Sequence, residues 1–177
     1  MLLLLLYSII CDTYIFKDNQ ILTAQDVVKT KSLYSKPIKN VFIKNIKVIG
    51  KYAFKSCYEL KSIRIHSSLE SIGEKAFYNC SNLESVSFEK ESITTISNSV
   101  FKHCFNLKSI QIPSSVDSIG EKVFYNCSNL ESVSFENESK LTTINNSAFK
   151  HCSNLKSIQI PSSLESIGEK YFITVQI

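Results

Sequence analysis

The apolar positions of this chain recur with a period of 23 to 25 residues. A phenylalanine column shows the period most clearly, at Phe54, Phe77, Phe101, Phe124, Phe149 and Phe172. In the first five units a cysteine follows the phenylalanine by three residues and a leucine follows it by six. The unit reads F-x-x-C-x-x-L-x-x-I-x-I, then a loop, then L-x-x-I-G-x-x-A-F. Self-similarity at this period predicts a solenoid of stacked rungs.

Each unit contains one short alternating segment, of which Ser62 to Ile65 (SIRI) is the first clear example. Alternation of polar and apolar residues predicts a strand with one buried face. Equivalent strands can then stack in parallel, about 4.8 Å apart. All variation in unit length falls after Ile65 and its counterparts, so we expect an exposed loop there. A single unit buries too little apolar surface to fold alone, and stacking supplies the rest.

All four glycines stand in one column, Gly50, Gly73, Gly120 and Gly168. A glycine column predicts a left-handed or a crowded backbone turn. A longer period is also present, because the stretch that begins at Ser71 recurs almost unchanged from Ser118. This indicates that the array grew by copying a block of two units.

The unit resembles the BspA-like leucine-rich repeat. Residues Leu107 to Cys127 (LKSIQIPSSVDSIGEKVFYNC) match its pattern L-x-x-I-x-I-P-x-x-L-x-x-I-G-x-x-A-F-x-x-C almost throughout. The resemblance covers about residues 40 to 172, and it departs at Val175, which stands where the cysteine belongs. It implies a leucine-rich-repeat solenoid, a right-handed superhelix with short parallel β-strands on the concave face. It also implies surface or secreted proteins linked to adhesion and host-protein binding, and no catalytic residues come with it.

We divide the chain into a hydrophobic start at residues 1–11, an amino-terminal cap segment at 12–40 and a repeat array at 41–177. The array holds about five full units and a truncated last unit. Thr23 and Asp26 are spaced to cap a short helix through Lys29. Leu2 to Cys11 is about half the roughly 20 residues of a membrane-spanning helix. That length suits a signal peptide, although no basic residue precedes it; the alternative is a strand packed on the domain.

The carboxyl end alternates as a strand from Ile173 to Ile177 and would leave an open apolar edge. We expect self-association through this edge, or a chain that is a fragment of a longer array.

Composition excludes several classes of protein. Apolar residues make up 44%, which excludes a disordered chain. The net charge of +4 is too mild and dispersed to indicate a nucleic-acid partner. The sequence shows no nucleophile elbow, phosphate loop or paired carboxylates, so we expect no enzyme and no cofactor. We interpret the column cysteines as buried thiols rather than metal ligands or disulfides, and we expect His103 and His151 to face outward.

The outward strand positions form the best candidate for a binding face, with a protein (a host or matrix protein) or a glycan as the partner. The alternative is that they only support the sheet, since Lys61, Glu84, Lys108, Glu131 and Lys156 alternate in charge from unit to unit. The candidate residues are Ser62, Arg64, Ser85, Ser87, Ser109, Gln111, Ser132, Ser134, Ser157 and Gln159.

Four N-x-S/T sequons offer candidate glycosylation sites, at Asn79, Asn126, Asn137 and Asn145. Asn79 and Asn126 directly precede core cysteines, where we expect poor access. The sequence as a whole favours a non-catalytic binding module, secreted or at the cell surface and of the adhesion type. The alternatives are a cytoplasmic leucine-rich-repeat scaffold and a fragment without independent function.

Overall fold

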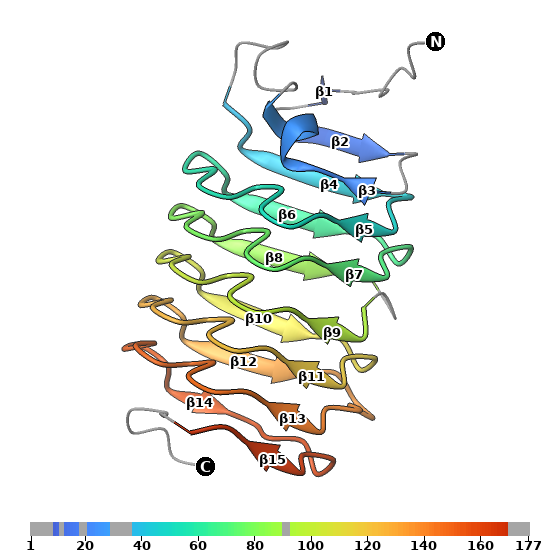
Figure 1. The fold of residues 1–177 in the computed structure, drawn as a ribbon. Helices are drawn as coiled ribbons and strands as arrows, with labels where there is room; N and C mark the ends of the chain where they lie inside the picture. The colour runs from blue at the N-terminus through green and yellow to red at the C-terminus, as the bar shows by residue number, and fades with distance from the viewer. Residues whose placement is uncertain (1–8, 11–12, 18–20, 29–36, 90–92, 170–177) are drawn as a thin grey trace.

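The chain coils into a stack of rungs in which two parallel sheets run the length of the molecule (Figure 1). The computed structural model describes residues 9–10, 13–17, 21–28, 37–89 and 93–169. Each full rung contributes one strand to each sheet, so strands distant in sequence become neighbours. This is the leucine-rich-repeat solenoid with short parallel strands that the sequence predicts.

The first sheet has eight strands in the order β1-β2-β4-β6-β8-β10-β12-β14. Among the described strands its pairs are parallel except β1 with β2, which is antiparallel. The strands are β1 (Ile9–Ile10), β2 (Thr13–Lys17), β4 (Asn40–Lys44), β6 (Ser62–Ile65), β8 (Ser85–Phe88), β10 (Ser109–Ile112), β12 (Ser132–Phe135) and β14 (Ser157–Ile158).

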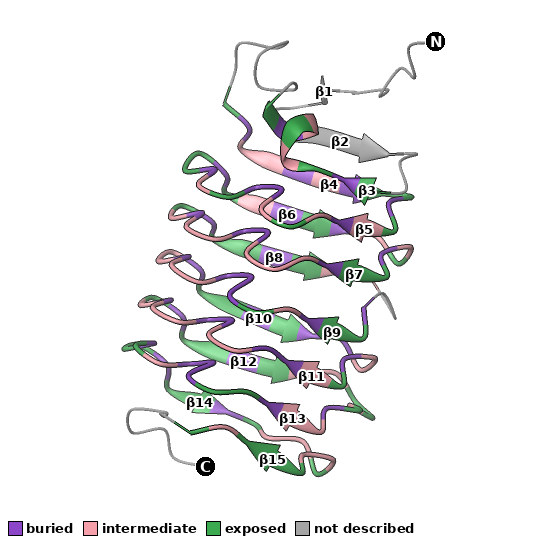
Figure 2. Ribbon diagram, viewed as in Figure 1, coloured by how far each residue is buried: buried purple, intermediate pink, exposed green. Residues whose placement is uncertain are grey.

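The second sheet has seven strands of two residues each, in the order β15-β13-β11-β9-β7-β5-β3. They are β3 (Ile21–Leu22), β5 (Val48–Ile49), β7 (Ser71–Ile72), β9 (Thr95–Ile96), β11 (Ser118–Ile119), β13 (Thr143–Ile144) and β15 (Ser166–Ile167). Exposed and buried positions alternate along strands such as β7 and β10, whereas both residues of β15 are exposed, as Figure 2 shows.

The interior consists of rows of identical or similar apolar side chains, one residue per rung. The phenylalanine rings of Phe54, Phe77, Phe101, Phe124 and Phe149 stack face to face, with successive centroids 5.2–5.7 Å apart and planes within 17°. Stacking of this kind adds about 0.5–1.5 kcal/mol per pair to the burial itself. The spacing of the sequence columns therefore becomes a continuous core.

The cysteine column lies in a row inside the stack, as predicted, and its five members are buried thiols that form no disulfide. Each later thiol donates to the phenylalanine carbonyl of the preceding rung. Cys80 Sγ lies 3.0 Å from the Phe54 oxygen, and Cys127 Sγ lies 3.1 Å from the Phe101 oxygen. The thiols thus join neighbouring rungs as well as filling space.

The turns on the phenylalanine side of the rungs make a third ladder, which the sequence analysis did not find. In the rung of Phe54, the amides of Tyr52, Phe54 and Ser56 donate to carbonyls of the next rung at 3.2, 2.7 and 2.8 Å. Tyr52 and Ser56 have φ of 61° and 56°. Later rungs repeat these bonds. Tyrosine, lysine, serine, histidine and asparagine occupy the left-handed positions, so residue type did not signal them.

The glycine column is crowded rather than left-handed. None of the described glycines has a positive φ. A Cβ on Gly73 would lie 2.6 Å from the Lys51 nitrogen, and one on Gly168 would lie 2.4 Å from the Asn146 nitrogen. The left-handed interpretation was therefore wrong, and glycine is needed because adjacent rungs approach closely here.

The segment expected to be an amino-terminal cap contributes a further rung. Strand β2 pairs with β4 from Thr13 to Lys17, and β3 pairs with β5. The expected helix begins after Thr23 and spans residues 24–28. Asp26 Oδ2 accepts from the Thr23 amide at 2.8 Å, and Thr23 Oγ1 accepts from the Asp26 amide at 3.3 Å, which forms a capping box. The sequence missed the rung because this segment lacks the phenylalanine and cysteine columns.

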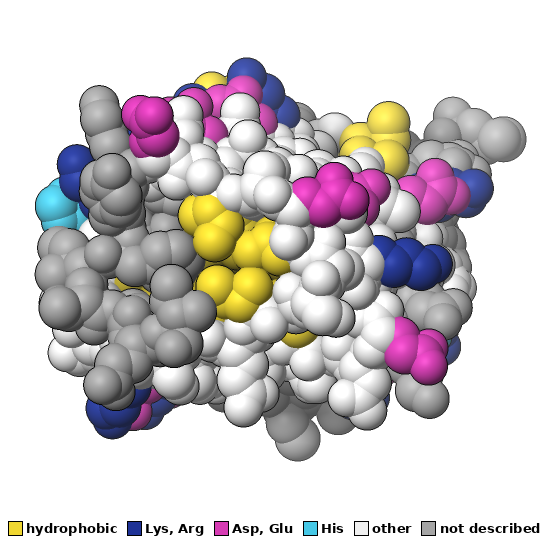
Figure 3. Space-filling model, turned by 90° about the horizontal axis from the view of Figure 1, so that it is seen from below, with side chains coloured by type: hydrophobic (Ala, Val, Ile, Leu, Met, Phe, Trp, Pro, Cys, Tyr) yellow, Lys and Arg dark blue, Asp and Glu magenta, His cyan; other side chains and the backbone are white. Residues whose placement is uncertain are grey.

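The two chain ends fall mostly outside the described residues. Of the apolar run from Leu2 to Cys11 only Ile9 and Ile10 are described, so its interpretation as a signal peptide lies outside the described residues. The predicted strand from Ile173 to Ile177 and the expected helix end at Lys29 also lie outside them. Within the part that is described, no helix is both long and apolar enough to cross a bilayer. Viewed from the carboxyl end of the stack, hydrophobic side chains gather at the centre of the face (Figure 3), and Ile167 of β15 is 46% exposed.

Candidate binding surfaces

The predicted site residues lie together on the outer side of the eight-stranded sheet. We call this surface, from Ser62 to Gln159, the polar strand face. Its first column consists of five serines that pair in register along the sheet. In the second column Arg64 pairs with Ser87 and Gln111 with Ser134. All ten side chains are exposed except the half-buried Ser62.

The amino-terminal end of this face carries chemistry that the sequence analysis missed. The Arg64 guanidinium lies 5.3 Å from the centroid of the Phe42 ring. Arg64 Nη2 lies 2.9 Å from Glu89 Oε1, and Arg64 Nε donates to the same oxygen at 3.1 Å. His66 Nε2 is 3.6 Å from Glu89 Oε2. Phe42 stands between the buried Val41 and Ile43, so strand alternation was the signal for its outward position.

The alternating charge column beside the serines forms ion pairs between rungs. Lys61 Nζ lies 4.0 Å from Glu84 Oε1, and Lys156 Nζ lies 2.9 Å from Glu131 Oε2. The hydrogen bond from Lys156, together with its charge, holds the pKa of Glu131 below its usual value. Because like charges would otherwise face each other, the alternation also favours one register of the rungs.

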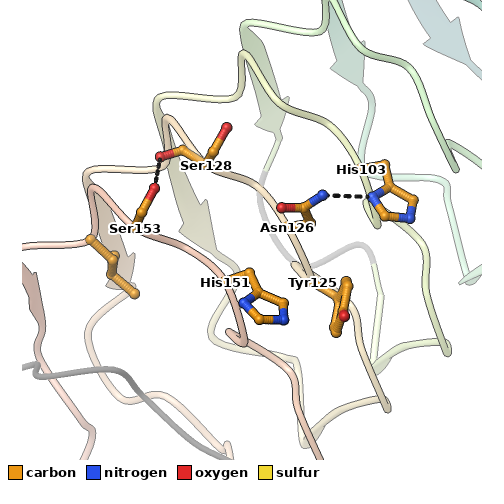
Figure 4. Close-up of a pocket in the computed structure, with 7 residues that line it drawn as sticks. His103, Tyr125, Asn126, Ser128, His151 and Ser153 are labelled. Carbon is orange, nitrogen blue, oxygen red and sulfur yellow. Dashed lines mark hydrogen bonds between the residues drawn. The ribbon is translucent and has the colours of Figure 1, made fainter.

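A second surface lies over the phenylalanine-side turns and holds an open groove of about 690 Å³ (Figure 4). Its lining consists of His103, Tyr125, Asn126, Ser128, His151, Ser153 and Leu155. The Asn126 amide nitrogen lies 3.1 Å from His103 Nδ1, and Ser153 Oγ donates to the Ser128 carbonyl at 3.3 Å. The Tyr125 ring meets both histidine rings nearly at right angles, with centroids 5.9 and 5.0 Å away.

The described lining of the groove brings two histidines and two serines together without a carboxylate. His151 is exposed and His103 is half-buried. Burial, followed by the charge of Lys102, lowers the pKa of His103 and so favours its neutral imidazole. The described lining contains no carboxylate that could orient a histidine beside a serine nucleophile. Within the described residues, no three His, Cys, Asp or Glu side chains converge as a metal site.

An asparagine ladder separates the two surfaces and was also missed. Asn106 Nδ2 donates to Asn82 Oδ1 at 3.1 Å, Asn129 donates to Asn106 at 3.1 Å, and Asn154 donates to Asn129 at 3.3 Å. The signal was present, because an asparagine precedes the core leucine in four successive units.

The four sequons lie in different settings. Asn79 and Asn126 are half-buried, have φ near 60° and point their amides at Tyr58 and His103. Asn145 is exposed, but its amide donates to the Ile119 carbonyl at 3.0 Å. Asn137 is exposed in the loop of variable length that follows β12.

Three solved structures share this fold. A leucine-rich-repeat protein of T. pallidum aligns with a TM-score of 0.55 and 19% identity, over 92% of this chain and 82% of that one. The pneumococcal vaccine antigen PcpA aligns with a TM-score of 0.67 and 20% identity, over 92% and 44%. A leucine-rich cell-surface protein of Faecalibacterium prausnitzii aligns with a TM-score of 0.52 and 24% identity, over 92% and 48%.

This chain therefore spans less than half the length of two of these three proteins. No protein of curated function matches it. The family model for the BspA type leucine rich repeat region matches residues 47–177 in six copies. Repeat arrays of this kind generally act as binding scaffolds rather than as catalysts. The repeated columns, the paired parallel sheets and the family match agree, and the chain belongs to the BspA-type leucine-rich-repeat family.

Proposed function

We propose that this protein is a non-catalytic binding module that holds another protein against the polar strand face. The observation that carries the proposal is the in-register pairing of serine, glutamine and arginine side chains from Ser62 to Ser157, all of them exposed except the half-buried Ser62. Small polar side chains on a sheet leave a flat surface with free donors and acceptors. The buried row beneath holds them rigidly, so little conformational entropy is lost on binding.

The amino-terminal end of the face provides the anchor for this partner. Binding energy in protein interfaces concentrates at aromatic and arginine side chains. Here Arg64 lies over Phe42 and is oriented by Glu89. The serine columns then extend the contact area along the stack, where they supply complementarity rather than most of the affinity.

The proposed location is secreted or at the cell surface, in a role of the adhesion type. Two of the structurally similar proteins are described as a cell-surface protein and as a vaccine antigen. The chain also begins with an apolar run of signal-peptide length. In a eukaryotic secretory pathway Asn137 would be the most accessible glycosylation site.

The reduced state of the column cysteines favours an alternative, a scaffold in a reducing compartment. Oxidising compartments promote disulfide formation, and the five column cysteines form no disulfide with one another. Expression of the full chain with an epitope tag separates the two locations. Secretion and a glycosidase-sensitive mass that disappears in Asn137→Gln would support the proposal. Retention in the cytosol without modification would support the scaffold.

The binding face is tested with purified protein against a panel of extracellular-matrix and plasma proteins by surface plasmon resonance. Ser109→Tyr combined with Ser132→Tyr places two rings at the centre of the face, and Arg64→Glu reverses the anchor. We expect each change to weaken binding by at least about tenfold, which corresponds to about 1.4 kcal/mol.

Ser162→Tyr, on the loop that follows β14, is the matched control and should leave binding within about twofold. If Ser162→Tyr weakened binding as much as the face variants do, the assignment of binding to the polar strand face would be overturned. Absence of any protein ligand in the panel would count against a protein partner.

A further inference from the structure

The phenylalanine-side turns present a second functional surface that the proposed protein-binding role does not use. In these turns, residues 51–56, 74–79, 98–103, 121–126 and 146–151 hold six lysines and two glutamates. One column alternates lysine with tyrosine from rung to rung. We call it the lysine–tyrosine band; its members are Lys55, Tyr78, Lys102, Tyr125 and Lys150.

Within the band, Lys55 and Lys102 lie over tyrosine rings of neighbouring rungs. Lys55 Nζ lies 5.8 Å from the Tyr78 ring centroid. Lys102 Nζ lies 5.9 Å from the Tyr78 ring and 4.7 Å from the Tyr125 ring. Such cation–π contacts hold the ammonium groups in place without neutralising their charge. The chain thus positions cations at fixed intervals along its length.

The two glutamates of this surface do not neutralise the band. Glu74 binds Lys51 and Lys75 at 2.7 and 2.6 Å, and Glu121 binds Lys122. Among the described residues, no carboxylate lies within ion-pair distance of Lys55, Lys102 or Lys150. Partial burial, and then the charges of Lys122 and Lys75, lower the pKa of Lys102 by more than the charge of Glu121 raises it. An anion bound beside Lys102 would offset the repulsion from Lys122 and Lys75.

The spacing of the band lysines along the stack favours one class of anionic ligand. The band places one lysine on every second rung, and two rungs of a parallel sheet span about 10 Å. A linear acidic polysaccharide carries its carboxylates or sulfates at a disaccharide interval close to this distance. A nucleic-acid strand is much denser, with one phosphate per ~3.4 Å of duplex axis.

The neighbouring groove supplies the neutral part of such a site. The His103, Asn126 and His151 side chains directly follow band residues in sequence and line the groove with Ser128 and Ser153 (Figure 4). These groups offer hydrogen bonds to sugar hydroxyls. The half-buried Phe105 ring lies 5.7 Å from the His103 ring and adds an apolar surface of the kind on which sugar rings pack.

We propose that the lysine–tyrosine band and the adjoining groove bind a linear acidic polysaccharide that lies along the axis of the solenoid. The protein partner would occupy the eight-stranded sheet, so the two ligands use different surfaces of the same rungs. The two proposals therefore stand or fall separately.

The test measures binding of chondroitin sulfate oligosaccharides of defined length by calorimetry, at about 0.15 M salt. We expect saturable binding that weakens by at least about tenfold in the triple variant K55Q/K102Q/K150Q. The matched control is K61Q/K108Q/K156Q, which removes the same charge from the sheet side and should change affinity by less than about threefold. Circular dichroism verifies that both variants keep the fold.

Two further measurements separate a polysaccharide site from a general polyanion patch. Ser153→Leu fills the groove without changing charge and should weaken the oligosaccharide while leaving a single-stranded DNA of equal charge unaffected. The DNA itself should bind at least about tenfold more weakly than the oligosaccharide, and phosphatidylserine vesicles should not bind.

Equal losses in the two triple variants, DNA binding as tight as oligosaccharide binding, or capture of the vesicles would each overturn the proposal. None of these results affects the protein-binding face, which is measured with its own variants.

Discussion

Each described column cysteine keeps its thiol inside the stack, where the thiolate form is strongly disfavoured. Burial raises the pKa values of Cys104 and Cys127 well above the ordinary value of a thiol. The second cause is the electrostatic effect of the neighbouring thiols in the column. Burial raises the pKa of Cys152 to about 12. Because the thiolate is the reactive form, these residues should be inert while the rungs are closed.

We therefore expect a thiol reagent at about pH 8 to leave all five column cysteines unmodified in the native protein and to modify all five in denaturant. Cys11 lies outside the described residues, so the experiment uses a Cys11→Ala background with mass spectrometry as the readout. Rapid modification without denaturant would contradict the buried arrangement.

The same burial makes stability depend on alkaline pH. A raised folded-state pKa means that the native protein keeps a proton which the unfolded chain releases above its ordinary value of 9.0. The contribution of Cys152 is therefore complete below pH 9 and is lost as pH rises towards about 12. In urea titrations above pH 9, Cys152→Ala should lose less free energy of unfolding than the wild type. Equal losses of unfolding free energy in the two proteins would contradict a raised pKa at Cys152.

The glycine column provides a steric test at the same scale. We expect Gly73→Ala to reduce the free energy of unfolding by about 1–3 kcal/mol, because the new Cβ would meet backbone atoms of the preceding rung that cannot move independently. Gly50→Ala is the matched control, since its nearest neighbour would be the Leu22 oxygen at 3.0 Å, and it should cost less than about 1 kcal/mol. Denaturant titration measures both; equal costs would be inconsistent with crowding at Gly73.

At the scale of the elements, strands account for only part of the cohesion between rungs. The two sheets, the turn ladder and the asparagine ladder link neighbouring rungs at different corners of the coil. Strands of two residues, such as β7 and β11, persist because each is one segment of a ladder that continues through the stack. Isolated pairs of that length would not be stable.

The asparagine ladder predicts a measurable loss when it is interrupted. Asn106→Ala removes a donor to Asn82 and the acceptor for Asn129, so we expect a loss of about 1 kcal/mol in the free energy of unfolding. Asn137→Ala changes the same residue type in an exposed loop and should stay within about 0.5 kcal/mol. Thermal unfolding of the two variants distinguishes a structural ladder from incidental surface contacts, which would leave both unchanged.

At the scale of the whole molecule, the architecture is one-dimensional, and each rung contacts only its neighbours. Because the sequence repeats every two units, a block of two units can be removed with almost no change in the sequence at the junction. Deleting residues 71–117 joins Glu70 to Ser118, and Ser118 begins nearly the same sequence that Ser71 began. The rung interfaces at the junction keep their residue types and their register.

We expect the deleted protein to fold with the same circular dichroism per residue. Its denaturant m-value should fall by about a quarter, because m scales with the surface exposed on unfolding. Its melting temperature should also fall, since two rung interfaces are lost. Loss of a cooperative transition would show that the block is not interchangeable.

The repeat itself was readable from sequence because a solenoid places every copy of a position in the same environment. The buried columns of phenylalanine, cysteine, leucine and isoleucine, and the exposed serine column, therefore followed from spacing alone. The helix cap at Thr23 and Asp26 was also readable, because it depends on residues three apart. Family membership rests on the same columns.

Only the tertiary structure decided what depends on backbone path and on contacts between rungs. The left-handed turn positions, the extra rung at β2 and β3, and the contact between Arg64 and Phe42 belong to this group. Residue type carries little information there, because hydrogen bonds between rungs stabilise torsions that lysine or histidine would not adopt alone. Sequence periodicity thus specified which residues stack, and the stacking specified how the backbone turns between them.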